Sequence, residues 1–201
     1  MLLKLLTASL LFSTGVLITA CGEDKAPSSP QTTPPVSNTT TTQPSPNNAI
    51  TSLAVGSVAL GMNLDEALAS IPNATSETAE DGEGIEWTAI NVAANTLMNV
   101  LLNEEGSIAL IRVFSPQFTT PQGVAVGMSV QDAADKLGGL TEIDFTEIES
   151  REFAKFKNMP DNTEFQIMSE EGMAGVYANG ATTTMMASPS ATISSIWIVE
   201  D

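Results

Sequence analysis

The sequence contains no histidine, and its single cysteine, Cys21, lies close to the N-terminus. The absence of histidine excludes a Ser-His-Asp or Cys-His arrangement, an imidazole general base and a histidine-ligated zinc site. With one cysteine the chain forms no intrachain disulfide. We therefore expect a protein that is not an enzyme and that has no cofactor.

Basic residues are also scarce. Seven lysines and arginines stand against 24 aspartates and glutamates, which gives a formal net charge of −17. Binding of nucleic acid requires basic side chains that replace counterions along the phosphates, and the few basic residues here form no stripe. The same deficit excludes a polybasic patch for anionic lipid headgroups. We expect neither nucleic acid nor a charged membrane surface as a partner.

No apolar run is long enough to span a bilayer. The longest, Leu5 to Ala20, follows Lys4 and is diluted by serines and threonines, which is the layout of a secretory signal. It ends in Ile18-Thr19-Ala20-Cys21, which resembles the lipobox of bacterial lipoproteins. This resemblance implies that residues 1–20 are a signal peptide and that Cys21 is lipidated, with palmitate-type acyl chains as the membrane contact. The alternative is an ordinary secretory signal before a free cysteine.

The predicted cellular location follows from the same segment. Gly22, rather than aspartate, comes after the cysteine, which in enteric bacteria favours the periplasmic face of the outer membrane. Residues 21–49 are rich in Pro, Thr, Ser and Asn, a composition that cannot bury a core, so we predict a disordered linker. The remaining residues 50–201 are one domain's worth of chain.

An internal duplication divides this domain. The segment 58–63 (VALGMN) reappears as 124–129 (VAVGMS), displaced by 66 residues, and Glu104-Glu105-Gly106 falls on Glu170-Glu171-Gly172 at the same displacement. Matches at one offset indicate a repeat, with halves at about 55–115 and 121–199. After Gly172 the register breaks, because 107–113 corresponds to 192–198. The second half therefore contains an insertion, residues 173–191.

Each half begins with a helix that its own residues cap, Asn63 with Glu66 and Ser129 with Asp132. Pro72 and Gly138-Gly139 end these helices. Three β-type segments follow each helix, at about 85–92, 96–103 and 107–114, and at about 151–157, 163–169 and 192–199. We predict an α+β fold with antiparallel sheet, a tandem duplication of a helix-plus-three-strand unit with a hairpin insertion in the second half.

The helix start Gly-Met-Asn/Ser followed by antiparallel strands, in tandem, looks like the architecture of the β-lactamase-inhibitor-protein and BamE (SmpA/OmlA) group. The stretch from Leu97 to Gly139, with its turn 103–106 and its motif 123–129, resembles a family of short, sigma-E-regulated outer-membrane lipoproteins of unknown function. The chain departs from BamE in lacking a basic surface. The resemblance implies a fold and a compartment, and a partner in the cell envelope.

Two sets of carboxylates are candidate sites. Glu86 and Glu152 occupy equivalent strand starts. Two such acids could serve as the acid pair of glycan hydrolysis. Because acids are rarely buried unpaired, we instead expect both to face solvent. Acidic loops offer weak candidates for a divalent cation such as calcium: Asp81, Glu83, Glu147 and Glu149. No calcium-loop motif is present, and solvated acidic loops are the alternative interpretation.

The insertion holds the only tyrosine of the chain. The turn Asn179-Gly180, flanked by 176–178 and 181–184, predicts a two-residue hairpin. Aromatic and thioether side chains adapt to and bury well against a partner, so we expect partner binding through Tyr177, Asn179, Met185 and Met186. The alternative is an edge hairpin that only covers the sheet.

Arg112 and Trp197 stand at equivalent places in the last strand of each half. Arg112 is a candidate anchor for an anionic group, although we expect it to lie along the sheet with its head in water. Trp197 is expected in the core or at its rim. Two functions emerge: a lipid-anchored binding module for an envelope protein, or a lipoprotein that binds a small ligand or a divalent cation.

Overall fold

The computed structural model describes residues 46–81 and 84–199. The predicted signal peptide, Cys21, almost all of the predicted linker and Glu83 lie outside the described residues. Neither α-helix of the described residues is long and apolar enough to cross a membrane.

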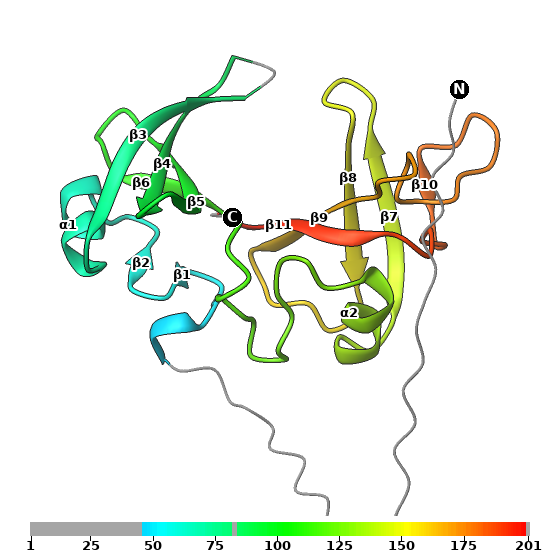
Figure 1. The fold of residues 1–201 in the computed structure, drawn as a ribbon. Helices are drawn as coiled ribbons and strands as arrows, with labels where there is room; N and C mark the ends of the chain where they lie inside the picture. Colours follow the sequence, from blue (N-terminus) through cyan, green and yellow to red (C-terminus); the bar gives the residue numbers. More distant parts are fainter. Residues whose placement is uncertain (1–45, 82–83, 200–201) are drawn as a thin grey trace, which may run out of the picture. The chain divides into compact units, whose positions relative to one another are not determined.

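Strands make up most of the regular structure in these two ranges (Figure 1). The elements in chain order are η1 (Pro46–Asn48), β1 (Ala54–Val55), β2 (Val58–Ala59), α1 (Leu64–Ser70), β3 (Ala74–Glu80), β4 (Glu86–Val92), β5 (Asn95–Leu102), β6 (Ile108–Val113), α2 (Val130–Lys136), β7 (Leu140–Thr146), β8 (Arg151–Phe156), β9 (Thr163–Met168), β10 (Thr183–Thr184) and β11 (Thr192–Val199).

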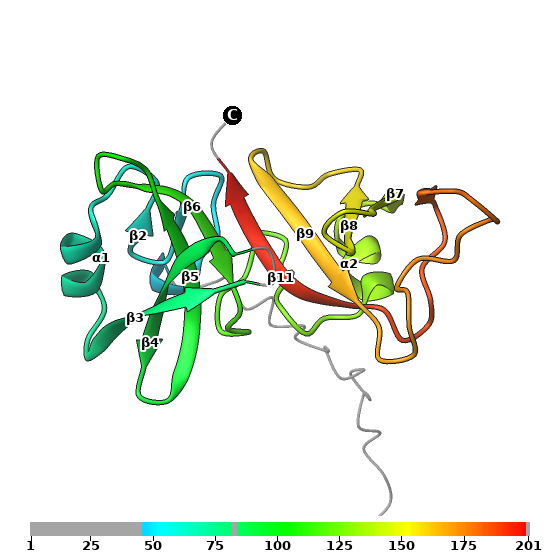
Figure 2. The same cartoon turned by 90° about the horizontal axis from the view of Figure 1, so that it is seen from above.

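Nine of the strands form one antiparallel sheet in the order β10-β7-β8-β9-β11-β6-β5-β4-β3, and β1 pairs with β2 separately. β9 and β11 of the second half run side by side near the middle of this sheet, and β11 pairs with β6 of the first half (Figure 2). The predicted α+β fold of two helix-plus-three-strand units is therefore wrong. Two short helices accompany a mostly β domain, and α1 is followed by four strands and α2 by five strands of a single shared sheet.

The long strand that was missed in each half is the one directly after the helix, β3 and β7, and the two-residue strands β1 and β2 were missed as well. β3 has the sequence ATSETAE, and it lies at the edge of the sheet with mostly exposed side chains, so it carries no apolar alternation. The other six long strands lie within one or two residues of their predicted positions.

The core lies on one face of the sheet. A row of directly paired residues crosses seven neighbouring strands there, and all of them are at most 1% exposed: Ile90, Met98, Val113, Ile196, Phe165, Ala154 and Ile143. Burying a large aliphatic side chain contributes about 1.5–3 kcal/mol. Both helices pack on this row's face, through Ala67 of α1 and Val130 and Ala133 of α2. Neither α-helix of the described residues lies on the opposite face.

Both helices begin in the same way. The N–H groups of Gly61 and Gly127 donate to the carbonyls of Ile108 and Ile193, each at 2.8 Å. Both glycines have a positive φ, 79° and 85°, which an L side chain rarely adopts. Ile108 and Ile193 correspond to each other in the predicted alignment of residues 107–113 with 192–198, so the two hydrogen bonds join equivalent positions. Asn63 forms a complete capping box with Glu66, and Ser129 caps the N–H of Asp132.

Candidate functional site

The helix-free face of the sheet carries an apolar row beside a polar and aromatic one. Leu101, Leu110 and Val199 are paired across β5, β6 and β11 and form the apolar row. Residues two positions away on the same strands point to the same face and lie about 7 Å along them. They form the second row, which is Asn99, Arg112, Trp197 and Glu164.

A cleft of about 730 Å³ opens over the apolar row and over Trp197 and Glu164 of the second row. Its volume lies within the usual range of small-molecule sites, roughly 300–1,000 Å³. Both halves line it. The first half contributes Ile85, Trp87, Leu101 and Leu110, whereas the second contributes most of the polar groups. We refer to it as the central cleft.

Aromatic rings pack edge to face beneath the central cleft. The ring centroid of Trp197 lies 5.7 Å from that of Trp87 and 5.6 Å from that of Phe153, in T-shaped geometry. Such ring pairs contribute about 0.5–1.5 kcal/mol beyond their buried area. Trp87 and Trp197 are only 3% and 7% exposed. The rings therefore support the wall of the cleft from inside the structure.

Arg112 is fixed among these rings. Its guanidinium lies 4.8 Å from the ring centroid of Trp197 and 4.9 Å from that of Phe114. Its Nη2 donates to Oε1 of Gln166 at 2.8 Å, and its Nε donates to Oγ of Ser195. The expectation that its head lies in water is therefore wrong, because hydrogen-bond acceptors and π-faces on the sheet replace the water.

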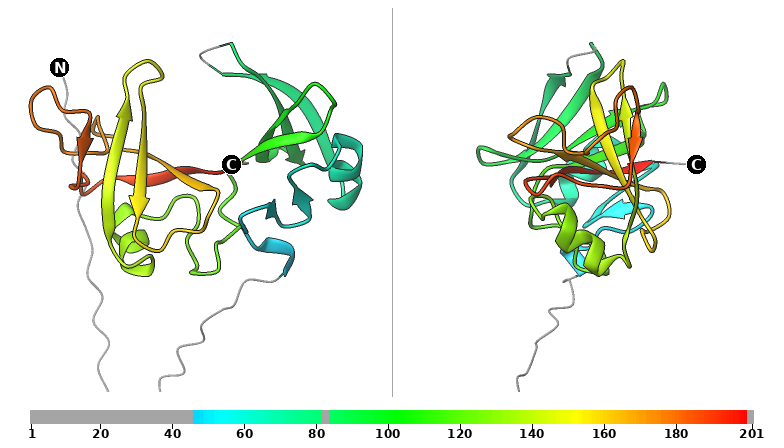
Figure 3. Two further views of the ribbon diagram at one scale, coloured as in Figure 1. Left: turned by 180° about the vertical axis from the view of Figure 1, so that it is seen from behind. Right: turned by 90° about the vertical axis from the view of Figure 1, so that its right-hand side faces the viewer.

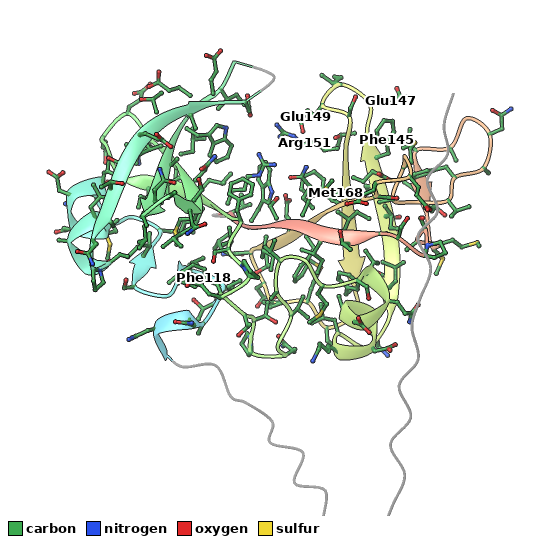
Figure 4. The ribbon with its side chains drawn as sticks, viewed as in Figure 1. Phe118, Phe145, Glu147, Glu149, Arg151 and Met168 are labelled. Carbon is green, nitrogen blue, oxygen red and sulfur yellow. The ribbon has the colours of Figure 1, made fainter. Side chains whose placement is uncertain are left out.

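An ion pair joins the two halves across the central cleft. Nη2 of Arg151, at the start of β8, lies 3.2 Å from Oδ2 of Asp81, which follows β3. The side chains of Arg151 and Asp81 are only 12% and 10% exposed. The carboxylate of Asp81 also accepts from the indole N–H of Trp87 and from the backbone N–H of Ile85. Figure 4 shows Arg151 on the side of β8 that faces the β3–β4 hairpin.

Most other charges of the cleft are paired as well. Nζ of Lys155 lies 2.8 Å from Oε1 of Glu142 and also contacts Asp144. The hydrogen bonds to Asp144 and Glu142 raise the pKa of the Lys155 ammonium. Arg151 additionally contacts Glu149 at 3.5 Å. Each of the two basic groups is thus shared by two carboxylates.

The predicted cation ligands do not gather. Asp81 and Glu149 are both bound to Arg151, Glu147 is exposed at the β7–β8 turn, and Glu83 lies outside the described residues (Figure 4). Among the side chains that the structure describes, no group of three or more acidic or cysteine residues could hold a metal ion. Arginine takes the carboxylates that a cation would need.

Glu86 and Glu152 have different surroundings. Glu86 is exposed, as expected, but Glu152 is 7% exposed, so the expectation that both face solvent is wrong. The Glu152 carboxylate accepts from the backbone N–H groups of Ala174 and Gly175 at 2.6 and 2.7 Å, and from the Tyr177 hydroxyl at 2.8 Å. Both glutamates alternate with residues that line the cleft, so they point away from it.

The insertion therefore has a structural anchor. Tyr177, predicted to contact a partner, is half-buried between Glu152 and the ring of Phe145, which lies 6.2 Å away. Asn179 and Gly180 form the predicted turn, closed by the N–H of Ala181 on the carbonyl of Ala178. The flanking residues do not form the expected two-residue hairpin, because β10 pairs with β7 instead (Figure 3). For β10, the alternative interpretation holds: this part of the insertion covers the edge of the sheet at β7.

Met185 and Met186 remain accessible, at 69% and 63% exposure. They lie over a shallow hollow of about 340 Å³ that Val130, Ala134 and Leu140 also line. Of the predicted partner-binding residues, Asn179, Met185 and Met186 are exposed, whereas Tyr177 is half-buried.

Sequence reasoning missed Trp87, Arg151 and Glu164 as site residues. Arg151 precedes Glu152 in the second copy of the acidic segment, and a lone arginine among acids is a signal for an ion pair. Its partner Asp81 is 70 positions away, which no local pattern shows. Glu164 alternates with buried Thr163 and Phe165, and this places it on the open face.

Comparisons with known proteins bear on the fold. No protein-family model matches the chain, and no curated protein does. Among solved structures, the crystal structure of the uncharacterized protein yfeY from Escherichia coli is similar, with a TM-score of 0.52 and 15% sequence identity. The similarity covers 76% of this chain and 99% of that one. At this identity, it shows that the two chains share a fold.

Proposed function

We propose that this protein is a lipid-anchored binding protein of the cell envelope, without enzymatic activity, and that it receives a ligand with an apolar body in the central cleft. The observation that carries the proposal is the cleft itself, whose apolar row of Leu101, Leu110 and Val199 lies open beside packed rings. Clefts with apolar linings and a few fixed polar groups are typical ligand sites.

The preorganisation of the cleft supports binding. The Asp81–Arg151 ion pair fixes the two halves relative to each other, and Arg112 and Gln166 fix the ring of Trp197 from below. A site that is ordered before binding loses less conformational entropy when the ligand arrives, and this raises affinity. The arrangement fits the small-ligand form of the two functions that the sequence suggests.

The chain supplies its own reporter for the test. Trp87 and Trp197 are its only tryptophans, and both line the central cleft. We would titrate the domain with the neutral, apolar probe N-phenyl-1-naphthylamine and follow tryptophan emission. We expect saturable quenching in the wild type and a loss of affinity of about tenfold or more in Ile85→Asp, because a charge on the cleft wall resists burial beside the probe.

A matched control is available. Ile148 is 97% exposed at the β7–β8 turn and does not line the central cleft, so Ile148→Asp makes the same chemical change elsewhere. It should bind the probe like the wild type. Melting temperatures of both variants establish that they fold. Absence of saturable quenching, or equal affinities of the two variants, would remove the cleft from the proposed function.

The anchor is a separate part of the proposal. Cys21 would carry the acyl chains that hold the protein at the periplasmic face of the outer membrane, as the lipoprotein family that the sequence resembles implies. Growth with an alkyne-bearing palmitate should label the wild type and leave Cys21→Ser unlabelled, and the variant should leave the membrane fraction. Equal labelling of both proteins would contradict lipidation at Cys21.

A second candidate function, contact with an envelope protein, is supported by the exposure of Met185 and Met186 beside a hollow. Deletion of residues 173–191 is unsuitable as a test, because Ala174 and Ala191 are buried. A photo-crosslinking residue at position 185, compared with one at position 148, is sharper. A defined crosslinked protein from position 185 alone, lost with Met186→Ser, would support this function, and identical products from both positions would argue against it.

A further inference from the structure

Among the described charges that line the central cleft, one carboxylate forms no ion pair. Lys155 is shared by Glu142 and Asp144, and Arg151 by Asp81 and Glu149. The fifth acid is Glu164 on β9. Within residues 46–81 and 84–199 no hydrogen bond or ion pair is found for its carboxylate. Three acids (Asp144, Glu149 and Glu164) and two basic residues (Arg151 and Lys155) line the cleft, and of these five Glu164 alone forms no ion pair.

Glu164 also lies at a useful place. It is paired with Trp197 across β9 and β11, on the face that opens into the cleft. Val199 is two residues beyond Trp197 on the same face, so the apolar row begins about 7 Å from the position of Glu164. A ligand lying along β11 would reach the apolar row and the carboxylate together.

The electrostatic environment of Glu164 favours a cation. The Glu164 side chain is exposed on the open face, and partial desolvation by the neighbouring walls of the cleft raises the pKa of its carboxyl; Lys155 lowers this pKa and Glu149 raises it. A positive group beside Glu164 would stabilise the ionised carboxylate and offset its desolvation. The net charge of −17 also concentrates cations around the protein. A ligand anion would instead have to compete with two carboxylates for each basic residue.

We propose that the central cleft selects amphipathic cations: an amine or similar cationic head binds the carboxylate of Glu164, and the attached apolar body covers Leu101, Leu110 and Val199. The inference rests on the proposed function, since it names the chemical class of ligand for the same cleft. The head group would replace part of its hydration with a charge-assisted hydrogen bond in a partly desolvated site.

Three probes with one alkyl chain and different heads test the selectivity. We would titrate decylammonium, 1-decanol and decanoate at neutral pH, below their aggregation concentrations, and follow the emission of Trp87 and Trp197. Decylammonium should bind about tenfold more tightly than decanol, and decanoate should bind most weakly, because one charge-assisted contact in a partly buried site is worth on the order of 1.5 kcal/mol.

Glu164→Gln keeps the shape of the side chain and removes its charge. It should bring decylammonium to within about threefold of decanol without changing the affinity for decanol itself. Glu170→Gln makes the same change at an exposed position beyond the other end of β9, and it should behave like the wild type. A cationic preference that also vanished in Glu170→Gln would mean attraction to the overall charge, which would overturn the assignment to Glu164.

The outcomes separate the two proposals. If all three probes bind saturably with equal affinity, or if Glu164→Gln keeps the preference for decylammonium, the selectivity is wrong while the cleft remains a binding site. If no probe changes the tryptophan emission saturably, the proposed function is contradicted, and this inference is contradicted with it. Tighter binding of decanoate than of decylammonium would reverse the sign of the selectivity and overturn it directly.

Discussion

The first half of the domain leaves its outer strand uncovered, whereas the second half covers the equivalent strand with the segment between β9 and β11. β3 has one neighbour, β4, in the described sheet, but β7 lies between β8 and β10. The N–H of Phe145 in β7 donates to the carbonyl of Thr182 in the covering segment. Uncovered strand edges are prone to pair with other chains, and the mostly exposed β3 bears charged Glu77 and Glu80.

The comparison extends to one residue in each half. Glu86 and Glu152 start equivalent strands, yet Glu86 is exposed and Glu152 anchors the covering segment through three hydrogen bonds. What differs is the chain that lies over the carboxylate. The same side chain at the same position is thus a solvated surface acid in one half and a buried acceptor in the other.

Removal of the carboxylates of Glu86 and Glu152, one at a time, should give the largest difference in stability between the halves. Glu152→Ala leaves three donors without their acceptor, at about 1–3 kcal/mol each before relaxation, so we expect a loss of about 4 kcal/mol in the free energy of unfolding. Glu86→Ala should change it by less than about 0.5 kcal/mol. Urea unfolding followed by circular dichroism measures both, and similar losses would contradict the assigned difference.

The ion pair that joins the halves should matter more than an ion pair within one half. Asp81→Asn keeps an acceptor for only one of the N–H groups of Ile85 and Trp87, which bind Oδ1 and Oδ2 respectively, and it removes the charge opposite Arg151, so we expect a loss of about 1–2 kcal/mol. Glu142→Gln affects the half-exposed Lys155 and should cost about 0.5 kcal/mol or less. Raising the salt concentration should reduce the smaller effect more.

A double-mutant cycle checks that the larger effect belongs to the pair. Asp81→Asn and Arg151→Met should be less costly together than the sum of their separate costs, since both remove the same contact. Additive costs would mean that the two side chains act independently.

Tyr177 gives the second half a response to alkaline pH that the first half lacks. Burial is the main cause that raises the pKa of its hydroxyl, and the hydrogen bond to Glu152 raises it further. The folded protein keeps the proton where the unfolded chain has lost it, so this stabilisation is complete below about pH 10 and is lost as the pH rises above it. Tyr177→Phe should cost about 1.5 kcal/mol at neutral pH and remove this part of the alkaline loss.

The measurement is direct because Tyr177 is the only tyrosine. Its tyrosinate absorbance should appear at higher pH in the native protein than in urea. Lysines titrate in the same range in both proteins, so the difference between the wild type and Tyr177→Phe isolates the phenol. Coincident titrations in the native and unfolded states would contradict its burial against Glu152.

Local patterns in the sequence predicted the parts of the fold that are encoded locally. Asn63-x-x-Glu66 and Ser129-x-x-Asp132 mark both helix starts, and alternating apolar residues mark six of the long strands. β3 was missed because an exposed edge strand has no apolar face, and the merging of both halves into one sheet depends on the pairing of β6 with β11, a contact between residues more than 80 positions apart.

The candidate site was less accessible to sequence reasoning. Arg112, Trp197 and Asp81 were singled out, but each for a different reason: Trp197 lines the cleft, whereas Arg112 and Asp81 contact the lining residues Trp197 and Arg151, and these contacts depend on how the strands pair. The fate of Glu152 was predicted wrongly, because a glutamate at a strand start is usually solvated and nothing local shows that residues 174–177 return to cover it. Glu164 has no sequence signature.

The helix starts should show the smallest difference between the halves. Asn63 and Ser129 each accept a hydrogen bond from the N–H three residues on, at 2.9 and 3.0 Å, so Asn63→Ala and Ser129→Ala should each cost about 1 kcal/mol.

The return contacts differ. Glu66 accepts from the backbone N–H of Asn63 at 3.4 Å, whereas Asp132 accepts from the Ser129 hydroxyl at 2.7 Å. Because the cap survives without either carboxylate, Glu66→Ala and Asp132→Ala should cost only a few tenths of a kcal/mol. Thermal unfolding of the four variants would reveal whether the halves differ at their helix starts, and a much larger cost in one half would show that the equivalence of their hydrogen bonds does not extend to their energies.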